Sequence, residues 1–249
     1  EAYFRLDMST FAQEHAAERL VGAPPGFVGY EQGGELTNAV RRRPNLVILL
    51  DEIDKAHRRV FDVIMSILDD GRITDAQGNV VRFGQAIVIA TSNQGSHDLA
   101  ALVAEHGDAV TYEQIAEAST AAVRRDLEAA GRPEIFGRIA GAIVPFDVLR
   151  PEIIDRIAVK FATDASFANG PRLDVDLPST CAMARAELAD PTQRALGGRQ
   201  VRNVVQRHLR RLASWLGEQD ALTADHVAVR FDGTTMLAAV DGGAFLPVA

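Results

Sequence analysis

The eight residues NLVILLDE, at positions 45–52, constrain the fold more than any other part of this sequence. A continuous apolar run of this length, closed by two acids, is typical of a strand buried on both faces of a parallel sheet. The run AIVIATSN at 86–93 has the same character, and IVPF at 143–146 is a shorter third example. Segments with helical periodicity separate these runs, and this alternation predicts a parallel sheet with helical crossovers.

The segments between the apolar runs contain helix and turn signals. Thr10 and Gln13 fit a capping box, which predicts a helix reaching about Leu20. Apolar residues recur at helical spacing over 60–68, and Gly71 is placed to end that helix. We also expect helices over about 35–42 and 112–130, and a hairpin over 72–83 with its turn near Gln77 and Gly78.

The pattern changes after residue 147, where we place a domain boundary between 1–146 and 147–249. Pro151 opens a helix that runs to about Ala162. Beyond it we expect a strand over 172–177, helices over 179–188 and 199–216, and a final strand over 227–231, with a frayed end from about 242. Strands and helices of this mixed kind predict a small second domain.

Composition limits the classes of protein that fit. The 249 residues have a net charge of −8, which argues against a protein that coats nucleic acid. No apolar run reaches the ~18 residues of a membrane helix, and no signal peptide opens the chain. Cys181 is the single cysteine, which we interpret as a buried apolar residue, and no intrachain disulfide can form. We therefore expect a cytoplasmic protein without a membrane segment.

Polar side chains follow the two long apolar runs. Ligands of open α/β sheets bind at the carboxyl ends of the strands, where Asp51 and Glu52 lie. One acid can hold Mg²⁺ through water and the next can deprotonate an attacking water. Asn93 ends the second run and could hold a water nearby. Two solvated acids and a polar strand cap are the alternative interpretations.

Two arginines and one loop complete the candidate residues. Arg138 in GRPEIFGRI and Arg199 in LGGRQVRN suit phosphate oxygens, although a surface arginine is the alternative for each. The loop GAPPGFVGY at 22–30 combines glycines and prolines with Phe27, Val28 and Tyr30. A solvated loop rarely holds out rings, so this one is a candidate contact surface.

Several long motifs resemble the second ATPase module of the ClpB and ClpA group of AAA+ unfoldases. The motifs are RLDMSTFAQEH, RLVGAPPGFVGYEQGGELTNAVRRRPNLVILLDEIDKAH, ILDDGRITDAQGNVVRF and IVIATSN, and the likeness continues more loosely to GGR at 197–199. The resemblance implies an AAA+ P-loop-type parallel sheet with helices on both faces, over 1–146. It also implies a small mixed α+β C-terminal domain over 147–249.

The resemblance assigns a role to each candidate. Asp51 and Glu52 match the Walker B acids, with Asp51 holding Mg²⁺ through water and Glu52 activating water. Asn93 matches sensor 1, Arg138 the arginine finger that reaches a neighbouring subunit's ATP, and Arg199 sensor 2. ATP and Mg²⁺ are the implied cofactors.

The resemblance also interprets the aromatic loop. Gly26, Phe27, Val28, Gly29 and Tyr30 match the pore loop, which lines the central channel of a hexameric ring and grips unfolded or aggregated polypeptide. Phe27 stands where the family usually has Tyr, so a hydroxyl is lost and the ring is kept. The alternative is that Phe27 and Tyr30 pack into a local core.

The sequence departs from the family in three ways. It contains no G-x-x-x-x-G-K-[ST], the loop whose amides and lysine hold the phosphates, so we expect an N-terminally truncated chain that does not hydrolyse ATP alone. Its sheet would then lack the first strand and expose a pairing edge. GRIA at 137–140 replaces a segment close to NRID. No Leu-Gly-Phe or Ile-Gly-Phe precedes Arg138, so peptidase docking is not indicated.

Two classes of function remain open. The first is part of a homohexameric, ATP-driven protein unfoldase or disaggregase, with chaperone adaptors as candidate partners. The second is a non-hydrolysing ring subunit that acts as an interaction module. A nucleic-acid-handling relative is disfavoured, because Phe27 and Tyr30 stand where a phosphate-binding loop would have basic residues. The arginines around Arg199 are interpreted as a solvated or subunit-facing helix, and the histidines show no metal-ligand spacing.

Overall fold

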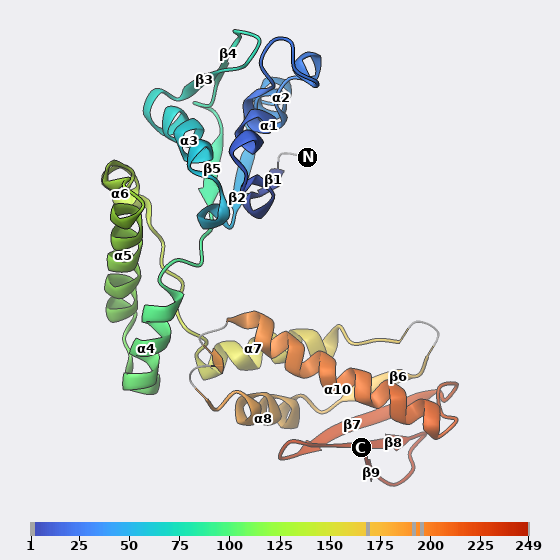
Figure 1. Ribbon diagram of the computed structural model, residues 1–249. Coiled ribbons are helices and arrows are strands. Elements are labelled where there is room, and N and C mark those ends of the chain that lie inside the picture. The colour runs from blue at the N-terminus through green and yellow to red at the C-terminus, as the bar shows by residue number, and fades with distance from the viewer. Residues whose placement is uncertain (1–2, 168–169, 191–192, 195–196, 249) are drawn as a thin grey trace. The chain divides into compact units, whose positions relative to one another are not determined.

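The structure is a computed structural model that describes residues 3–167, 170–190, 193–194 and 197–248. The chain divides into two units, each described here by itself. The first consists of Glu1–Gly95 and Thr120–Ile143, and the second of Ser96–Ser119 and Val144–Ala249 (Figure 1). The sequence-based boundary at 146/147 stays a prediction, and it lies close to the point where the first unit ends.

A three-stranded parallel sheet forms the centre of the first unit. It contains β1 (Tyr3–Asp7), β2 (Val47–Asp51) and β5 (Ile87–Ala90), in the order β1-β2-β5. Leu6 is in register with Leu50, and Leu50 with Ala90, so the carboxyl ends of all three strands meet at one edge. The α/β class and the parallel sheet are confirmed.

Helices and a hairpin connect the strands in the first unit. They are α1 (Ala17–Val21), α2 (Glu35–Arg42), α3 (Arg58–Asp70), β3 (Arg72–Thr74) and β4 (Val80–Arg82), with short 3₁₀ turns at Met8–Phe11, Glu14–Ala16, Tyr30–Gln32 and Ile53–Lys55. The expected α2, α3 and hairpin are therefore present. The expected single helix from Thr10 to Leu20 is wrong, because Asp7 caps the first turn instead, accepting a hydrogen bond from the Ser9 amide at 3.0 Å.

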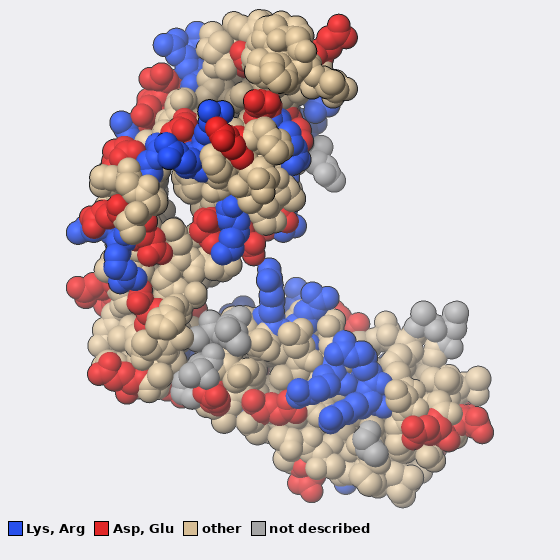
Figure 2. Space-filling view, viewed as in Figure 1, with Lys and Arg blue, Asp and Glu red and all other residues tan. Residues whose placement is uncertain are grey.

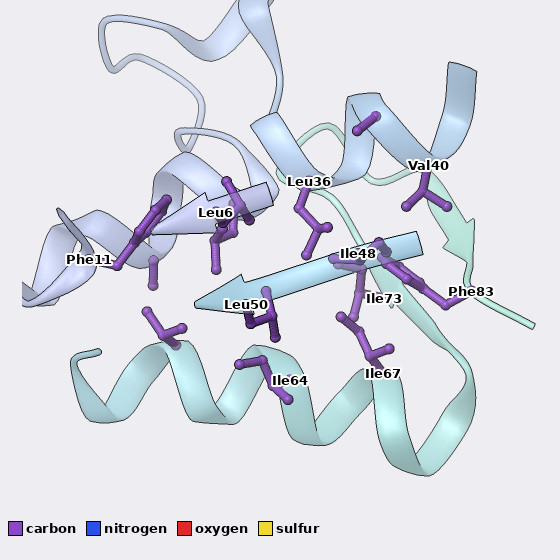
Figure 3. Close-up of a cluster of buried hydrophobic side chains, with 14 of the residues drawn as sticks. Leu6, Phe11, Leu36, Val40, Ile48, Leu50, Ile64, Ile67, Ile73 and Phe83 are labelled. Atoms are coloured by element: carbon purple, nitrogen blue, oxygen red, sulfur yellow. The ribbon is translucent and has the colours of Figure 1, made fainter. Parts of the chain in front are cut away.

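The core of this unit lies on one face of the sheet. Figure 3 shows Leu36 and Val40 of α2, and Ile64 and Ile67 of α3, gathered around the β2 side chains Ile48 and Leu50. Alternate residues point to the other face, where Tyr3 is 51%, Ile87 61% and Ile89 46% exposed. Among the described residues, the expected helical cover is thus observed on one face, and β5 is an edge strand.

A second helical layer packs on the outer side of α3. Its members are α5 (Tyr112–Ala129), which continues from the second unit, and α6 (Pro133–Ile139), followed by a 3₁₀ turn at Ala140–Ala142. Leu127, Ile135 and Phe136 form a small core with Phe61 and Met65 of α3.

The expected strand at 143–146 is absent. Val144 and Phe146 are 74% and 85% exposed, and within the described part of the chain no strand pairs with them. Pro145 has no N–H to donate to a sheet, and four residues without a partner strand gain no stable ladder.

The second unit contains helices packed beside a four-stranded mixed sheet. The elements are α4 (Ser96–His106), a 3₁₀ turn at Gly107–Ala109, α7 (Pro151–Thr163), β6 (Arg172–Val175), α8 (Leu177–Glu187), α10 (Gly198–Glu218), β7 (His226–Asp232), β8 (Thr235–Val240) and β9 (Leu246–Pro247). The sheet order is β6-β7-β8-β9, with β6 and β7 parallel and the other pairs antiparallel. The expected α+β character is confirmed.

The end of the chain is more ordered than expected. The strand over 227–231 is not the last, because Asp232 pairs with Thr235 across a tight turn and β8 returns along β7. The expected frayed end from 242 is also wrong, since β9 pairs with β8 and Val248 is 7% exposed. The Asp232-Gly233 pair is itself a hairpin signal in the sequence, and it explains why a further strand follows β7.

A buried carboxylate gives the first unit a predictable pH response. The Asp75 side chain is 1% exposed. Burial would raise its pKa, but hydrogen bonds from Asn79, Arg41 and Gln77 outweigh burial and leave the pKa below its ordinary value. The unfolded chain therefore binds a proton before the folded chain does, so stability falls as the pH drops below about 4. We expect the free energy of unfolding to fall less between pH 7 and pH 3 in Asp75→Asn than in the parent. Denaturant titrations at the two pH values measure this fall, and an equal fall in both proteins would contradict the expectation.

Candidate functional site

The Asp51 carboxylate is held at the carboxyl end of β2 from two sides. The Thr91 hydroxyl, just past β5, donates to Asp51 Oδ1 at 2.5 Å. Arg5 of β1 donates through Nε to Oδ2 at 3.1 Å, and its Nη2 lies 2.5 Å from the same oxygen. All three strands thus contribute to fixing one carboxylate, which remains 25% exposed.

Glu52 leaves the strand in an unusual backbone conformation. Its φ of 55° and ψ of 52° lie in the left-handed region, which costs a non-glycine residue about 1 kcal/mol or more. Its amide donates to the Thr91 hydroxyl at 3.1 Å, and the next amide, of Ile53, donates to the Thr91 carbonyl at 2.9 Å. The same threonine therefore fixes both Asp51 and the turn that places Glu52 beside it.

Asn93 lies at the same edge of the sheet. Its amide donates to Asp54 Oδ1 at 3.3 Å, and its side chain is exposed. Burial would raise the pKa of Asp54, but hydrogen bonds from Lys55, Asn93 and Ser92 lower it overall, so this anchor stays charged at neutral pH. The structure therefore brings the Asp51, Glu52 and Asn93 segments together.

The two candidate arginines lie on different units. Arg138 is on α6 in the first unit, about half-exposed, and forms an ion pair with Asp69 near the end of α3. Arg199 is exposed in the first turn of α10, in the second unit, where Figure 2 shows basic side chains gathered over the helix. Arg138 therefore belongs to the same unit as Asp51, and Arg199 to the other unit.

The aromatic loop is ordered by its own backbone and presents its apolar side chains to solvent. Phe27 is 65% exposed and Val28 fully exposed, while Tyr30 is half-buried. The Phe27 amide donates to the Pro24 carbonyl at 3.2 Å, and the Tyr30 amide to the Phe27 carbonyl at 3.3 Å. Phe27 therefore does not pack into a local core, and the loop holds a ring and a branched side chain outward.

The acids fit a magnesium ion that is shared with a nucleotide rather than held by the protein alone. Among the described residues, no group of three or more His, Cys, Asp or Glu side chains is placed to hold a metal. Mg²⁺ is commonly bound through one or two carboxylates, waters and substrate phosphates. Asp51, fixed and still accessible, matches the protein's share of that ligand set.

No local sequence pattern indicates Arg5, and the sequence indicates Thr91 only as part of a polar strand end. Both act through the register of the sheet, since Arg5 lies two residues before Asp7, which pairs with Asp51. Side chains two apart point to the same face, so the β1–β2 register would have indicated Arg5. The sequence predicts the strands, but not which residues of β1 lie opposite those of β2.

Comparison with known families bears on these strand-end residues. A family model described as "AAA domain (Cdc48 subfamily)" matches residues 1–141, more than half of the chain and all three strands of the parallel sheet. The chain belongs to this AAA family. The resemblance inferred from the motifs is thereby confirmed, and this is a Clp-family AAA+ module.

Curated relatives of this AAA module have chaperone names. It is 37% identical over 232 residues to "Chaperone protein ClpB 1" of Synechocystis sp., covering 92% of this chain and 25% of the relative. It is 48% identical over 157 residues to "Chaperone protein ClpB3, chloroplastic" of Arabidopsis thaliana, covering 63% and 16% of the two chains. The module thus spans about a quarter or less of the length of these relatives.

The helices of the structure bear on the expectation that the chain has no membrane segment. Within the part of the chain that the structure describes, none of the helices combines the length and the apolar character needed to cross a membrane.

Proposed function

We propose that this AAA module is part of an ATP-dependent protein unfoldase or disaggregase, which threads polypeptide through the pore of a homohexamer. The observation that favours this most is the combination, in one unit, of an exposed aromatic loop and the carboxylates at the end of β2. The chaperone names of the relatives support the same class. Unfolded or aggregated polypeptide is the proposed substrate, with chaperone adaptors as possible partners and the cytoplasm as the proposed location.

The strand-end residues suit hydrolysis of a bound nucleotide. Mg²⁺, when bound, would neutralise charge on the phosphates. Asp51, held by Thr91, would hold Mg²⁺ through water, and Glu52 would accept the proton of the attacking water. Asn93, whose side chain is exposed at the same edge of the sheet, would hold the attacking water in line with the phosphate. Arg138 would reach the ATP of a neighbouring subunit, and Arg199 would read the nucleotide within its own subunit.

Nothing in the described residues favours the alternative of a non-hydrolysing interaction module. Such a subunit has no physical need to hold the Glu52 backbone in a left-handed conformation beside the fixed Asp51 carboxylate. Peptidase docking is likewise not part of the proposal, because the segment before Arg138 lacks the tripeptide expected for it.

The proposal is tested with the complete protein and a stable fluorescent protein that has an unstructured tail. We expect loss of fluorescence with ATP, and none with a non-hydrolysable ATP analogue. Unfolding that proceeds equally with the analogue would contradict an ATP-driven motor.

The 249-residue chain by itself is proposed not to hydrolyse ATP. It has no G-x-x-x-x-G-K-[ST], so no lysine and glycine-rich loop is available to hold the phosphates. We expect phosphate release from the purified chain at the level of a buffer blank, with and without Arg199→Ala. Turnover that disappears with Arg199→Ala would refute this expectation.

A further inference from the structure

The loop that holds out Phe27 has a closed base. Its two ends approach so closely at Gly34 that a Cβ there would lie 2.2 Å from the Leu20 carbonyl oxygen and 2.6 Å from the Gly22 nitrogen. No side chain fits at position 34, so glycine is required for the two ends to meet. The loop over 22–34 is therefore closed at its base, where the backbone of its two ends is in contact.

The tip of the β3–β4 hairpin rests against this base. The Ala76 amide donates to the Val21 carbonyl at 3.1 Å, just before the loop begins. Gln77 Nε2 donates to the Tyr30 carbonyl at 3.0 Å, three residues after Phe27. The hairpin thus contacts the loop's first end and also its far arm.

Asp75 makes the hairpin tip rigid. Its Oδ1 accepts from the Asn79 amide at 2.8 Å and from the Gln77 amide at 3.0 Å, which closes the turn. Its Oδ2 forms an ion pair with Arg41 of α2. The buried carboxylate therefore connects the turn that presents Gln77 to the helix that follows the loop.

The network closes on the loop from the other side. Asn38 Nδ2 donates to the Gln32 carbonyl at 2.6 Å, and Asn38 Oδ1 accepts from Arg41 Nη1 at 3.1 Å. Starting from Arg41, one branch reaches Gln32 through Asn38, and the other reaches Tyr30 through Asp75 and the Gln77 turn. Both branches end on backbone carbonyls of the loop's far arm.

Along the chain, helix α3 connects the hairpin to the residues that follow β2. Helix α3 begins three residues after Lys55, ends at Asp70 and leads through its capping residue Gly71 into β3. The Phe83 amide, at the end of the hairpin, donates to the Gly71 carbonyl at 2.7 Å. Helix α3 and the hairpin are therefore linked both by chain continuity and by a backbone hydrogen bond at the base of the hairpin.

We propose that the hairpin tip is the brace of the aromatic loop, with Gln77 as the positioning residue that transmits movement of α3 to it. The consequence for function rests on the proposed threading activity. Losing one neutral hydrogen bond should shift the ratio of braced to released loop by about fivefold. Threading per ATP should fall while ATP hydrolysis continues, because Gln77 forms its hydrogen bonds with Asp75 and Tyr30, away from the proposed catalytic groups.

The brace is tested by the mobility of a nitroxide spin label at Val28→Cys in the complete protein, with Cys181 and any other cysteines replaced. Gln77→Ala removes the donor, Gln77→Glu keeps the size but offers only acceptors, and Thr74→Ala is the matched control at an exposed site of the same hairpin. We expect both Gln77 variants to increase the mobility of the label at an unchanged melting temperature, and Thr74→Ala to leave it as in the parent. Equal mobility in Gln77→Ala and Thr74→Ala would overturn the brace.

A second measurement separates the brace from the function it serves. With Val28 intact, substrate unfolded per ATP hydrolysed is compared between Gln77→Ala and Thr74→Ala. A lower ratio in Gln77→Ala supports transmission through the brace. An unchanged ratio, together with increased label mobility, would support the structural brace and overturn its role in threading.

Discussion

Glu52→Gln in the complete protein is expected to lower ATP hydrolysis by about 10²–10⁴-fold, the usual contribution of a positioned general base. The amide cannot accept the proton of the attacking water, yet it preserves the size of the side chain and the left-handed turn. ATP should therefore still bind, and the protein should accumulate in its ATP-bound state. Steady-state phosphate release and binding of a fluorescent ATP analogue measure the two effects.

The control is Glu128→Gln, which makes the same chemical change at an exposed position of α5. It should leave both measurements at the parental level. Glu52→Gln with more than half of the parental turnover would remove Glu52 from the role of base and would return this acid to the interpretation of a solvated strand end.

Arg138→Ala is expected to have the other large effect, a loss of about 10³–10⁵-fold in hydrolysis if this residue acts as an arginine finger. Nucleotide binding should change little, because the proposed target is the ATP of the neighbouring subunit. In the structure Arg138 also pairs with Asp69, so the effect of losing this ion pair must be distinguished from the effect of losing an arginine finger.

Asp69→Asn makes that separation, because it removes the ion pair and keeps the arginine. The pair is between half-exposed groups, and such pairs contribute about 1 kcal/mol or less. We expect Asp69→Asn to hydrolyse ATP at close to the parental rate while Arg138→Ala is nearly inactive. Similar losses in both variants would show that Arg138 serves α3 packing and not catalysis.

How far the sequence predicted this fold depended on whether the signal was local. Helix α2 and the end of α3 at Gly71 follow from periodicity and a stop residue, and the structure has both. The strand expected at 143–146 failed because a strand needs a partner, and four residues around Pro145 do not specify one. The capping box at Thr10 failed because Asp7 competes for the same turn.

The candidate site also divides into residues with a local sequence signal and residues whose contacts depend on distant segments. Asp51, Glu52 and Asn93 could be placed at one edge because parallel strands end together, and the structure places them there. Arg5 could not be identified, since its contact with Asp51 depends on the register between two strands. The links from Gln77 to Tyr30 and from Asp75 to Arg41 join segments that are 47 and 34 residues apart, and no local pattern indicates them.

We propose that a ring of these modules uses Phe27 to grip polypeptide while ATP hydrolysis drives the movement of that polypeptide. The most direct test of this proposal measures ATP hydrolysis and substrate unfolding together in the complete protein, for Phe27→Ala and for Phe27→Tyr. We expect Phe27→Ala to hydrolyse ATP within about twofold of the parent but no longer to unfold substrate, because the contact area of the aromatic ring is lost. Phe27→Tyr should retain both activities, because it keeps the ring. Substrate unfolding at the parental rate by Phe27→Ala would show that Phe27 does not grip the polypeptide.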